Sequence, residues 1–375
     1  MKRIRLRWLG PGVCLLLFSG SGRALALPIY AARERMACVN CHVDPSGGGL
    51  RNAFGFDYLR NRHAMSPESR WPDLPEEQPE LAPKLPVGGD LRVLYDLLHR
   101  RTEEDFPSEV SSFFRMQGSF YLSYAPIQPV RAYYNQDVNG VRDLWAMVSA
   151  MEGAAYVRIG AFRLPYGLRL DDHTIYQRDD LPAPVSVLGF DPRTPDAGIE
   201  GGWIKPRWFA QAALTNGSGP SFDANREKAV TGRIGGWQGP LMAGVTAHYD
   251  RDPGSGGALI ERLRFGTYGT LSAHPNVVLL GAFDLGEDEI GGAITRSLLA
   301  WGEADYFLGR EARFRLRYEF LDQNRDFEFA DSERYTIETD WTPLPFNTLR
   351  VSYRFTSNEN VSDLEEIVGL WHFHF

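Results

Sequence analysis

The chain has 375 residues, with 40 Lys and Arg against 48 Asp and Glu and a formal net charge of −8. This acidic balance argues against a nucleic-acid-binding protein, which needs basic residues to neutralise phosphates. A mean hydropathy of −0.31 argues against a bundle of membrane-spanning helices, since each needs about 20 mostly apolar residues. Three Cys are too few for a scaffold held together by disulfides.

Residues 1–26 have the features of a secretory signal peptide. A basic cluster between Lys2 and Arg7 precedes a short apolar run over 13–18, and Ala-Leu-Ala at 24–26 fits the small-x-small cleavage pattern. The apolar run is far too short for a membrane anchor. We therefore expect residues 1–26 to direct export and to be removed, which leaves two of the three Cys.

These two Cys lie in Cys38-Val39-Asn40-Cys41-His42, the C-x-x-C-H motif of c-type haem attachment. Two thiols at this spacing can form thioethers to one haem, and the adjacent imidazole then reaches the iron. A zinc site would need two more ligands, and a thioredoxin-like dithiol would need a βαβ context. Because c-type haem is attached after export, the preceding signal peptide strengthens the interpretation. The sequence predicts one covalent haem c on Cys38 and Cys41, with His42 as proximal ligand.

Two residues downstream are candidates for the sixth iron ligand. His63 is the first choice and Met65 the second. The alternative for His63 is an exposed side chain beside its polar neighbours at 60–62. A Met ligand raises the haem potential relative to two His ligands, so the choice bears on the direction of electron flow.

Residues 27–65 are predicted to form a small monohaem cytochrome c module. At about 40 residues it is at the lower limit for independent folding, so we expect it to lean on the rest of the chain. Residues 66–88 are rich in Pro and acidic residues, which predicts a semi-extended linker.

From Gly89 to Phe375 the chain repeats segments of about ten residues in which apolar and polar residues alternate. Over 312–320, for example, apolar residues alternate with three Arg and one Glu. A period of two predicts β-strands. We expect about sixteen strands, at 89–99, 112–125, 128–137, 142–152, 154–164, 196–206, 207–217, 229–238, 241–251, 261–273, 276–286, 294–307, 311–321, 333–343, 346–357 and 364–375.

The connectors favour a membrane barrel over a soluble β-sandwich. Every second connector is tight, and most of the others are longer and charged, as in outer-membrane barrels. Trp371, Phe373 and Phe375 share one face of the last strand, which resembles the terminal signature that barrel-assembly machinery reads. The predicted fold is therefore all-β: a transmembrane antiparallel β-barrel over 89–375 in the bacterial outer membrane. The even strand number places the haem module on the periplasmic side or in the lumen.

One loop has a distinct composition. The stretch from Gly160 to Gly167 resembles the G-x-F-x-x-P-[FY]-G element of phosphate-selective-type porins. The longest loop follows, at about 165–195, and in porins such a third loop often folds inward and narrows the pore. A carboxylate and His cluster there could bind a hard cation such as Fe(II), or could simply solvate the loop or the pore constriction. Its residues are Asp171, Asp172, His173, Tyr176, Arg178, Asp179, Asp180, Asp191 and Arg193.

A haem motif ahead of a porin-like barrel resembles the fused outer-membrane cytochrome–porin family that includes iron oxidases of Fe(II)-oxidising bacteria. The supporting stretches are Ala32-Arg33, Met36-Ala37-Cys38 and Asn52-Ala53-Phe54-Gly55. Residues 43–50 replace the aromatic-Pro-Leu run usual after the family's motif. The resemblance implies that Cys38 and Cys41 attach the haem and that His42 is its proximal ligand.

The motif and the resemblance together predict an electron conduit. One haem would transfer electrons between an extracellular donor or acceptor, Fe(II) among them, and a periplasmic c-type cytochrome. That activity would be an electron-transfer oxidoreductase of the Fe(II):cytochrome c type, whose chemistry belongs to the haem. The alternative is a solute porin of the anion or phosphate type with a structural or sensory haem. Lumen-facing side chains would tune ion entry; they are Arg313, Arg315, Arg317, Arg350, Arg354 and Glu338.

Overall fold

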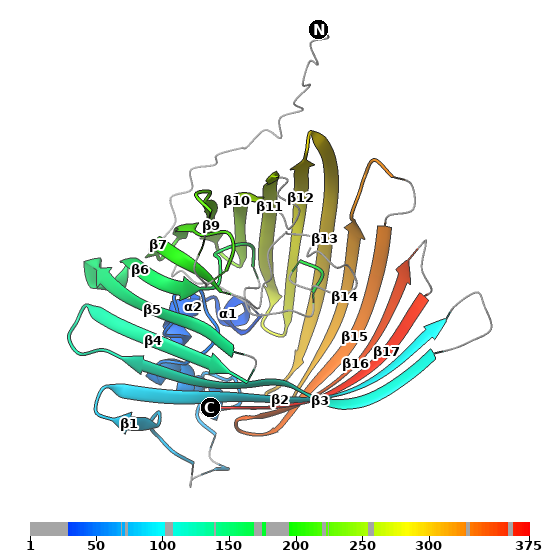
Figure 1. Cartoon of the computed structure of the whole chain (residues 1–375). Coiled ribbons are helices and arrows are strands. Elements are labelled where there is room, and N and C mark those ends of the chain that lie inside the picture. Colours follow the sequence, from blue (N-terminus) through cyan, green and yellow to red (C-terminus); the bar gives the residue numbers. More distant parts are fainter. Residues whose placement is uncertain are drawn as a thin grey trace.

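The computed structural model describes residues 29–375 with short gaps, so the expected signal peptide lies outside the described residues. The gaps are 69, 72–73, 102–107, 139, 169–174, 178–194, 220–222, 224, 254–258, 328–330 and 359–362. Three short helices come first, and strands make up most of the remaining chain (Figure 1).

The helices are α1 (Ile29–Glu34), α2 (Cys38–Cys41) and α3 (Ala53–Arg60), with a 3₁₀ turn, η1, at Met151–Gly153. Asn52 caps α3 by accepting a hydrogen bond from the Gly55 N–H at 2.9 Å. Its amide also donates to the backbone carbonyls of Val39 and Asn40, at 3.1 and 3.0 Å. One side chain therefore fixes the start of α3 against α2. None of the helices in the described part of the chain is long and apolar enough to cross a membrane.

Sixteen strands form a closed antiparallel barrel. Each strand from β2 to β17 pairs with the next, β17 pairs back with β2, and β1 adds a short extra strand beside β2 (Figure 1). The strands are β1 (Glu80–Ala82), β2 (Leu85–Arg101), β3 (Ser108–Tyr124), β4 (Val130–Asp137), β5 (Gly140–Ala150), β6 (Ala155–Phe162), β7 (Asp196–Lys205), β8 (Trp208–Thr215), β9 (Ala229–Gln238), β10 (Leu241–Pro253), β11 (Leu259–His274), β12 (Val277–Ile290), β13 (Ala293–Leu308), β14 (Ala312–Asp322), β15 (Asp331–Leu344), β16 (Asn347–Asn358) and β17 (Asp363–His374). The predicted antiparallel barrel of about sixteen strands is confirmed.

The start of the barrel differs from the prediction. Strand β2 begins at Leu85, inside the segment expected to be a linker, and β1 lies there as well. Pro86, which lacks an N–H, is the second residue of β2 and lies opposite Glu80 of β1. Strands tolerate proline at their beginnings and edges, so the proline-rich composition concealed a strand.

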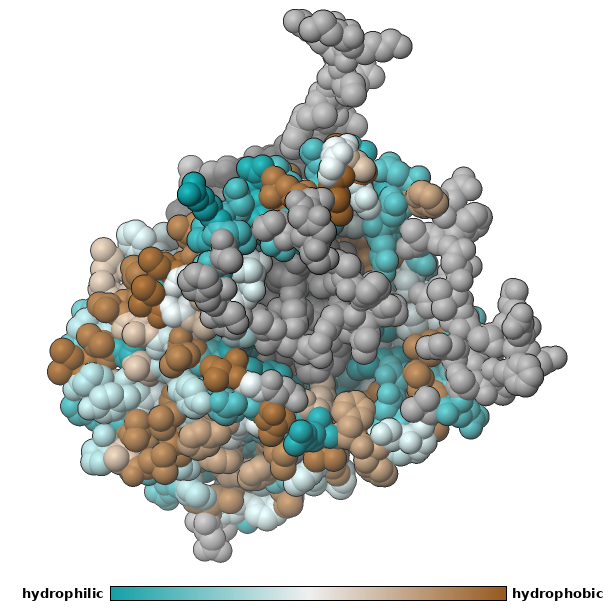
Figure 2. All heavy atoms as spheres, in the orientation of Figure 1, coloured by the Kyte–Doolittle hydropathy of each residue, from teal (hydrophilic) through white to brown (hydrophobic). Residues whose placement is uncertain are grey.

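The barrel has an apolar outside and a charged inside. On β14, Phe314 and Leu316 are 45% and 60% exposed, while Arg315 and Arg317 are only 3% and 4% exposed. Alternate residues point to opposite faces of a strand, so the period of two separates the two sets. Figure 2 shows apolar side chains gathered on the face where β3 to β5 lie in Figure 1. An apolar outer surface on a closed sheet suits a lipid environment.

The lumen is filled by the N-terminal segment, whose helices lie inside the ring of strands (Figure 1). Ile29 and Ala32 of α1 share one buried cluster with residues of β8 and β10 to β14. Val43 and Leu50 join a second cluster with aromatic residues of β3 to β6. Phe56 of α3 packs against Phe346, in the tight turn between β15 and β16. These contacts hold the segment to several parts of the inner wall.

Candidate functional site

A cavity of about 310 Å³ lies between the N-terminal segment and the barrel wall. Cys38, Cys41, His42 and His63 line it, so the structure brings four of the five predicted cofactor residues together. Met65 is 52% exposed and is not among the lining residues. The wall contributes Asp90, Arg92, Leu94, Met116, Arg313, Arg315, Asp340, Thr348, Arg350, Ser352, Arg354, Val368, Leu370, His372 and His374.

The haem motif forms a compact turn that opens on this cavity. The His42 N–H donates to the Cys38 carbonyl at 2.9 Å, and His42 also forms an antiparallel bridge with Arg51. The chain reverses between them through Gly47, whose φ is +91°. A Cβ on Gly47 would lie only 3.0 Å from the Cys38 Sγ, so a side chain there would have to displace Cys38 as well as adopt a strained positive φ.

The two thiols do not resemble a redox or zinc-binding pair. Cys38 and Cys41 do not form a disulfide. Burial raises the pKa of Cys38 to about 12 and that of Cys41 to about 11. Redox-active and metal-binding dithiols have a lowered pKa, because the thiolate is the reactive form. The surroundings of this pair therefore favour neutral thiols.

His63 is buried beside the motif. Its ring stacks on Tyr30 with 4.0 Å between centroids and 8° between planes, and the Arg33 guanidinium donates to its backbone carbonyl. Burial, together with the positive charges of Arg51, Arg33 and other cations, holds the pKa of His63 well below its usual value. The imidazole is therefore neutral at pH 7, the form that can coordinate a metal.

Arg51 supplies a positive charge at the cavity. Burial lowers the pKa of its guanidinium, and Asp90 is the first of the charged groups that oppose this shift. Arg51 forms no ion pair with any residue in the described ranges. The other cavity arginines are neutralised more fully: Arg315 Nε lies 3.1 Å from Asp305 Oδ1, and Arg350 Nε lies 2.7 Å from Asp340 Oδ1. Arg51 is thus the cavity cation best placed to receive an anionic group of a ligand.

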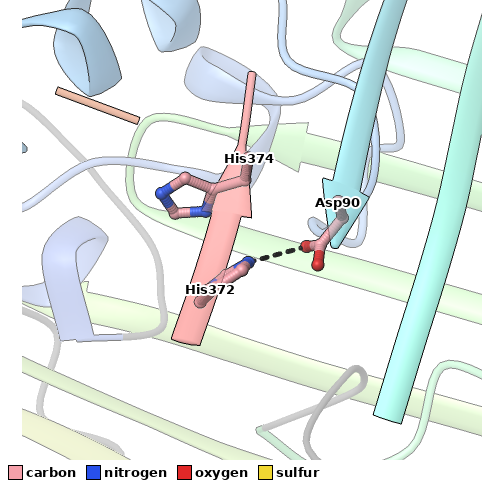
Figure 3. Close-up of side chains that lie close together, drawn as sticks. All are labelled: Asp90, His372 and His374. Atoms are coloured by element: carbon pink, nitrogen blue, oxygen red, sulfur yellow. Dashed lines mark ion pairs between the residues drawn. The ribbon is translucent and has the colours of Figure 1, made fainter. Parts of the chain in front are cut away.

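Sequence reasoning missed the contribution of the last strand. In Figure 3 the dashed ion pair joins His372 Nε2 to Asp90 Oδ2, at 3.0 Å, and the His374 ring lies to the left. His374 is 5% exposed, and both of its ring nitrogens are buried without a hydrogen-bond partner among the described residues. The alternation that leaves Trp371 41% exposed turns these two His toward the lumen. That pattern was the signal that could have found them.

The described part of the third outer loop also lies in the lumen, as its resemblance to porin loops implied. Tyr166 Oη donates to Asp284 Oδ1 of β12 at 2.7 Å, and the Tyr176 N–H donates to Glu319 Oε1 of β14 at 2.8 Å. Leu168, Ile175 and Tyr176 share the buried cluster of α1. The described residues of the loop therefore reach the inner wall at β12 and β14 and share a buried cluster with the N-terminal segment. The other charged residues of the predicted cluster lie outside the described residues; they are Asp171, Asp172, His173, Arg178, Asp179, Asp180, Asp191 and Arg193.

The fold is similar to that of known outer-membrane porins. The anion-selective porin from Comamonas acidovorans matches with a TM-score of 0.60 at 11% identity, over 78% of this chain and 99% of that one. Outer-membrane OmpT of Vibrio cholerae matches at 0.58 and 10%, over 78% and 97%. The DcaP channel of Acinetobacter baumannii matches at 0.55 and 10%, over 80% and 99%. No protein-family model matches the sequence, and neither does any curated protein. The chain thus has a porin-like β-barrel fold.

Proposed function

We propose that this protein is an outer-membrane electron conduit that holds one c-type haem inside its barrel. The observation that carries the proposal is the placement of Cys38, Cys41 and His42 on a cavity within the lumen. The apolar outer face and the porin-like fold support the membrane location.

The residues at the cavity fit a c-type haem. Cys38 and Cys41 would carry the two thioether links, and His42 would be the proximal ligand. Arg51 would pair with a propionate, which gives its buried charge a partner. When bound, the haem supplies one-electron transfer between its ferrous and ferric states. The protein's part is to fix the ligands and to limit the access of water, since the cavity lies between the N-terminal segment and the wall.

The packing of the lumen favours a conduit over a solute porin. An aqueous pore needs a continuous polar path, whereas here apolar clusters join the N-terminal segment to the wall and the third loop packs on α1. Arg158 of β6 also binds the N-terminal segment, because its guanidinium lies 2.8 Å from Asp44 Oδ2. The second candidate remains an anion porin with a structural or sensory haem. It is favoured by the likeness to an anion-selective porin and by the arginine-rich lumen.

One haem does not reach both membrane surfaces, because the hydrocarbon core alone is about 30 Å thick. The conduit therefore needs two partners: an extracellular donor or acceptor that enters from the loop side, with Fe(II) as the first candidate, and a periplasmic c-type cytochrome on the other side. The long loops and the short turns define these two ends. Folding of the barrel in the cell would use the barrel-assembly machinery.

Liposomes that contain the purified protein and trapped ferric cytochrome c test the proposal. External Fe(II) citrate should reduce the trapped cytochrome through the wild-type protein and through His274→Ala, a matched change at the exposed end of β11. Cys41→Ser and His42→Ala should abolish the reduction. Reduction at the wild-type rate in those two variants would overturn the conduit. Free passage of small anions without any cytochrome reduction would establish the porin instead.

A further inference from the structure

We propose that His374, on the last barrel strand, is the sixth ligand of the haem iron, so that closure of the barrel completes the haem site. This inference rests on the proposed haem function. It assigns the distal ligand to the barrel wall and not to the N-terminal segment, where the sequence placed it at His63 or Met65.

The His374 ring is buried in the cavity of the haem motif. It is 5% exposed, it lines the same cavity as the haem motif, and neither ring nitrogen has a hydrogen-bond partner among the described residues. Burying a polar group without a partner is costly, so an unsatisfied buried imidazole needs an explanation. A bond to iron provides one, because neutral imidazole is a common ligand of haem iron.

His374 also lies on a rigid support, the paired end of β17. The backbone N–H of His374 donates to the Phe346 carbonyl at 2.9 Å, and His374 lies opposite Asp90 where β17 pairs with β2. The next residue, Phe375, exchanges two backbone hydrogen bonds with Gly89, at 3.0 and 3.2 Å. The imidazole is therefore held by the seam that closes the barrel. A ligand on a paired strand is positioned more accurately than one on a loop.

The other histidines of the cavity are engaged differently. His372 Nε2 lies 3.0 Å from Asp90 Oδ2 and accepts a hydrogen bond from Arg92 Nε at 3.4 Å. One face of the His63 ring is covered by Tyr30, and its centroid lies 5.7 Å from that of His374. His63 is thus placed to pack beside the distal ligand. Met65 is absent from the cavity lining.

A separate cation site at the same place is the competing explanation. Ligand atoms of Asp90, His372 and His374 lie within 4.8 Å of one another, a donor set that suits Fe(II) (Figure 3). However, Arg92 Nε lies 3.1 Å from Asp90 Oδ1, and the positive charge of Arg51 also stabilises the ionised form of that carboxylate. The adjacent Arg92 guanidinium and the positive charge of Arg51 in the same cavity oppose a bound dication. The haem iron, whose porphyrin offsets its charge, is the better occupant.

The test uses the full-length exported protein, purified with its haem, and compares covalent haem content with spin state. The wild type should show low-spin, six-coordinate haem by absorbance and electron paramagnetic resonance. His374→Gln should keep the covalent haem but become high-spin, with at least a tenfold loss of the low-spin signal, and added imidazole should restore it. His274→Gln, at an exposed position outside the cavity, is the matched control and should remain low-spin, while His63→Gln and His372→Gln test the two competing ligands. Heat-modified electrophoretic mobility confirms that each barrel is folded.

Several outcomes separate the inference from the function on which it rests. A wild type without covalent haem overturns the proposed function and this inference with it. A haem-containing wild type that is high-spin, or a folded His374→Gln that stays low-spin, overturns this inference alone. Loss of the low-spin signal in His63→Gln, but not in His374→Gln, assigns the ligand to His63. If His374→Gln does not fold, His374→Met decides the question, because a Met ligand there should keep the haem low-spin and raise its potential.

Discussion

Asp44 ties the N-terminal segment to the barrel wall, and Asp44→Asn measures how much this buried contact contributes. Asp44 Oδ2 lies 2.8 Å from one terminal nitrogen of Arg158, and Glu200 Oε2 lies 2.7 Å from the other. Arg158 is 1% exposed, and its guanidinium lies 4.5 Å from the centre of the Phe162 ring. The arginine therefore cannot swing to water, and the Asn variant keeps the shape of Asp44 while it removes the charge.

The size of the effect follows from the partners that remain. A hydrogen bond to a charged group contributes about 1.5–3 kcal/mol. The larger penalty of about 3–5 kcal/mol for an unpaired buried charge does not apply, because Arg158 keeps Glu200. Since about 1.4 kcal/mol corresponds to a tenfold change in an equilibrium constant, the undocked population should rise about 10- to 150-fold.

Limited proteolysis of the folded protein measures that population. Proteinase K should release peptides from residues 29–65, quantified by mass spectrometry, at a rate proportional to the undocked fraction when docking is fast relative to cleavage. The control is Asp57→Asn in the same segment, whose side chain is 53% exposed and lies 3.4 Å from Arg60. Such a surface pair contributes about 0–1 kcal/mol, so its release should rise less than about fivefold. Equal release rates for the two variants would refute the reasoning.

Three further predictions concern the haem turn, the outer face and the third loop. Gly47→Ala should lower covalent haem content several-fold, measured per chain, while Gly302→Ala, with no atom within 4 Å of its Cβ, should not. Leu316→Arg places a charge on the outer face and should destabilise the barrel by about 2–4 kcal/mol in urea unfolding from lipid vesicles, with Phe327→Arg in an outer loop as control. Tyr166→Phe removes the hydrogen bond to β12 and should raise ion conductance in planar bilayers.

Each of these predictions has an outcome that contradicts it. Equal haem content in the two glycine variants would mean that the tight turn does not limit attachment. Equal midpoints for the two arginine variants would place the exposed face of β14 in water. Unchanged conductance in Tyr166→Phe, with the loop still ordered, would mean that the narrowing of the lumen lies elsewhere.

The barrel could be predicted from the sequence because its information is local. Side chains alternate between lipid and lumen with a period of two, and turn residues mark the ends of the strands. On β14 this fixed both the strand and the burial of Arg315 and Arg317, within one or two residues of the observed bounds. At one end, β2, β3 and β12 extend four residues beyond the prediction. At β2 the reason is that Pro86 and its neighbours resemble a linker, although a strand tolerates proline at its start.

The motif that defines the candidate site was equally local, since Cys38, Cys41 and His42 lie within five residues of one another. The residues that surround the motif in space come from distant parts of the sequence. Asp44 meets Arg158 across 114 positions, and the last strand brings His374 to the same cavity by pairing with the first barrel strand. The sequence by itself determined the sixteen strands, their two faces and the haem motif. Only the tertiary structure decided that the motif lies inside the lumen and which wall residues face it, because closure of the barrel joins strands from opposite ends of the chain.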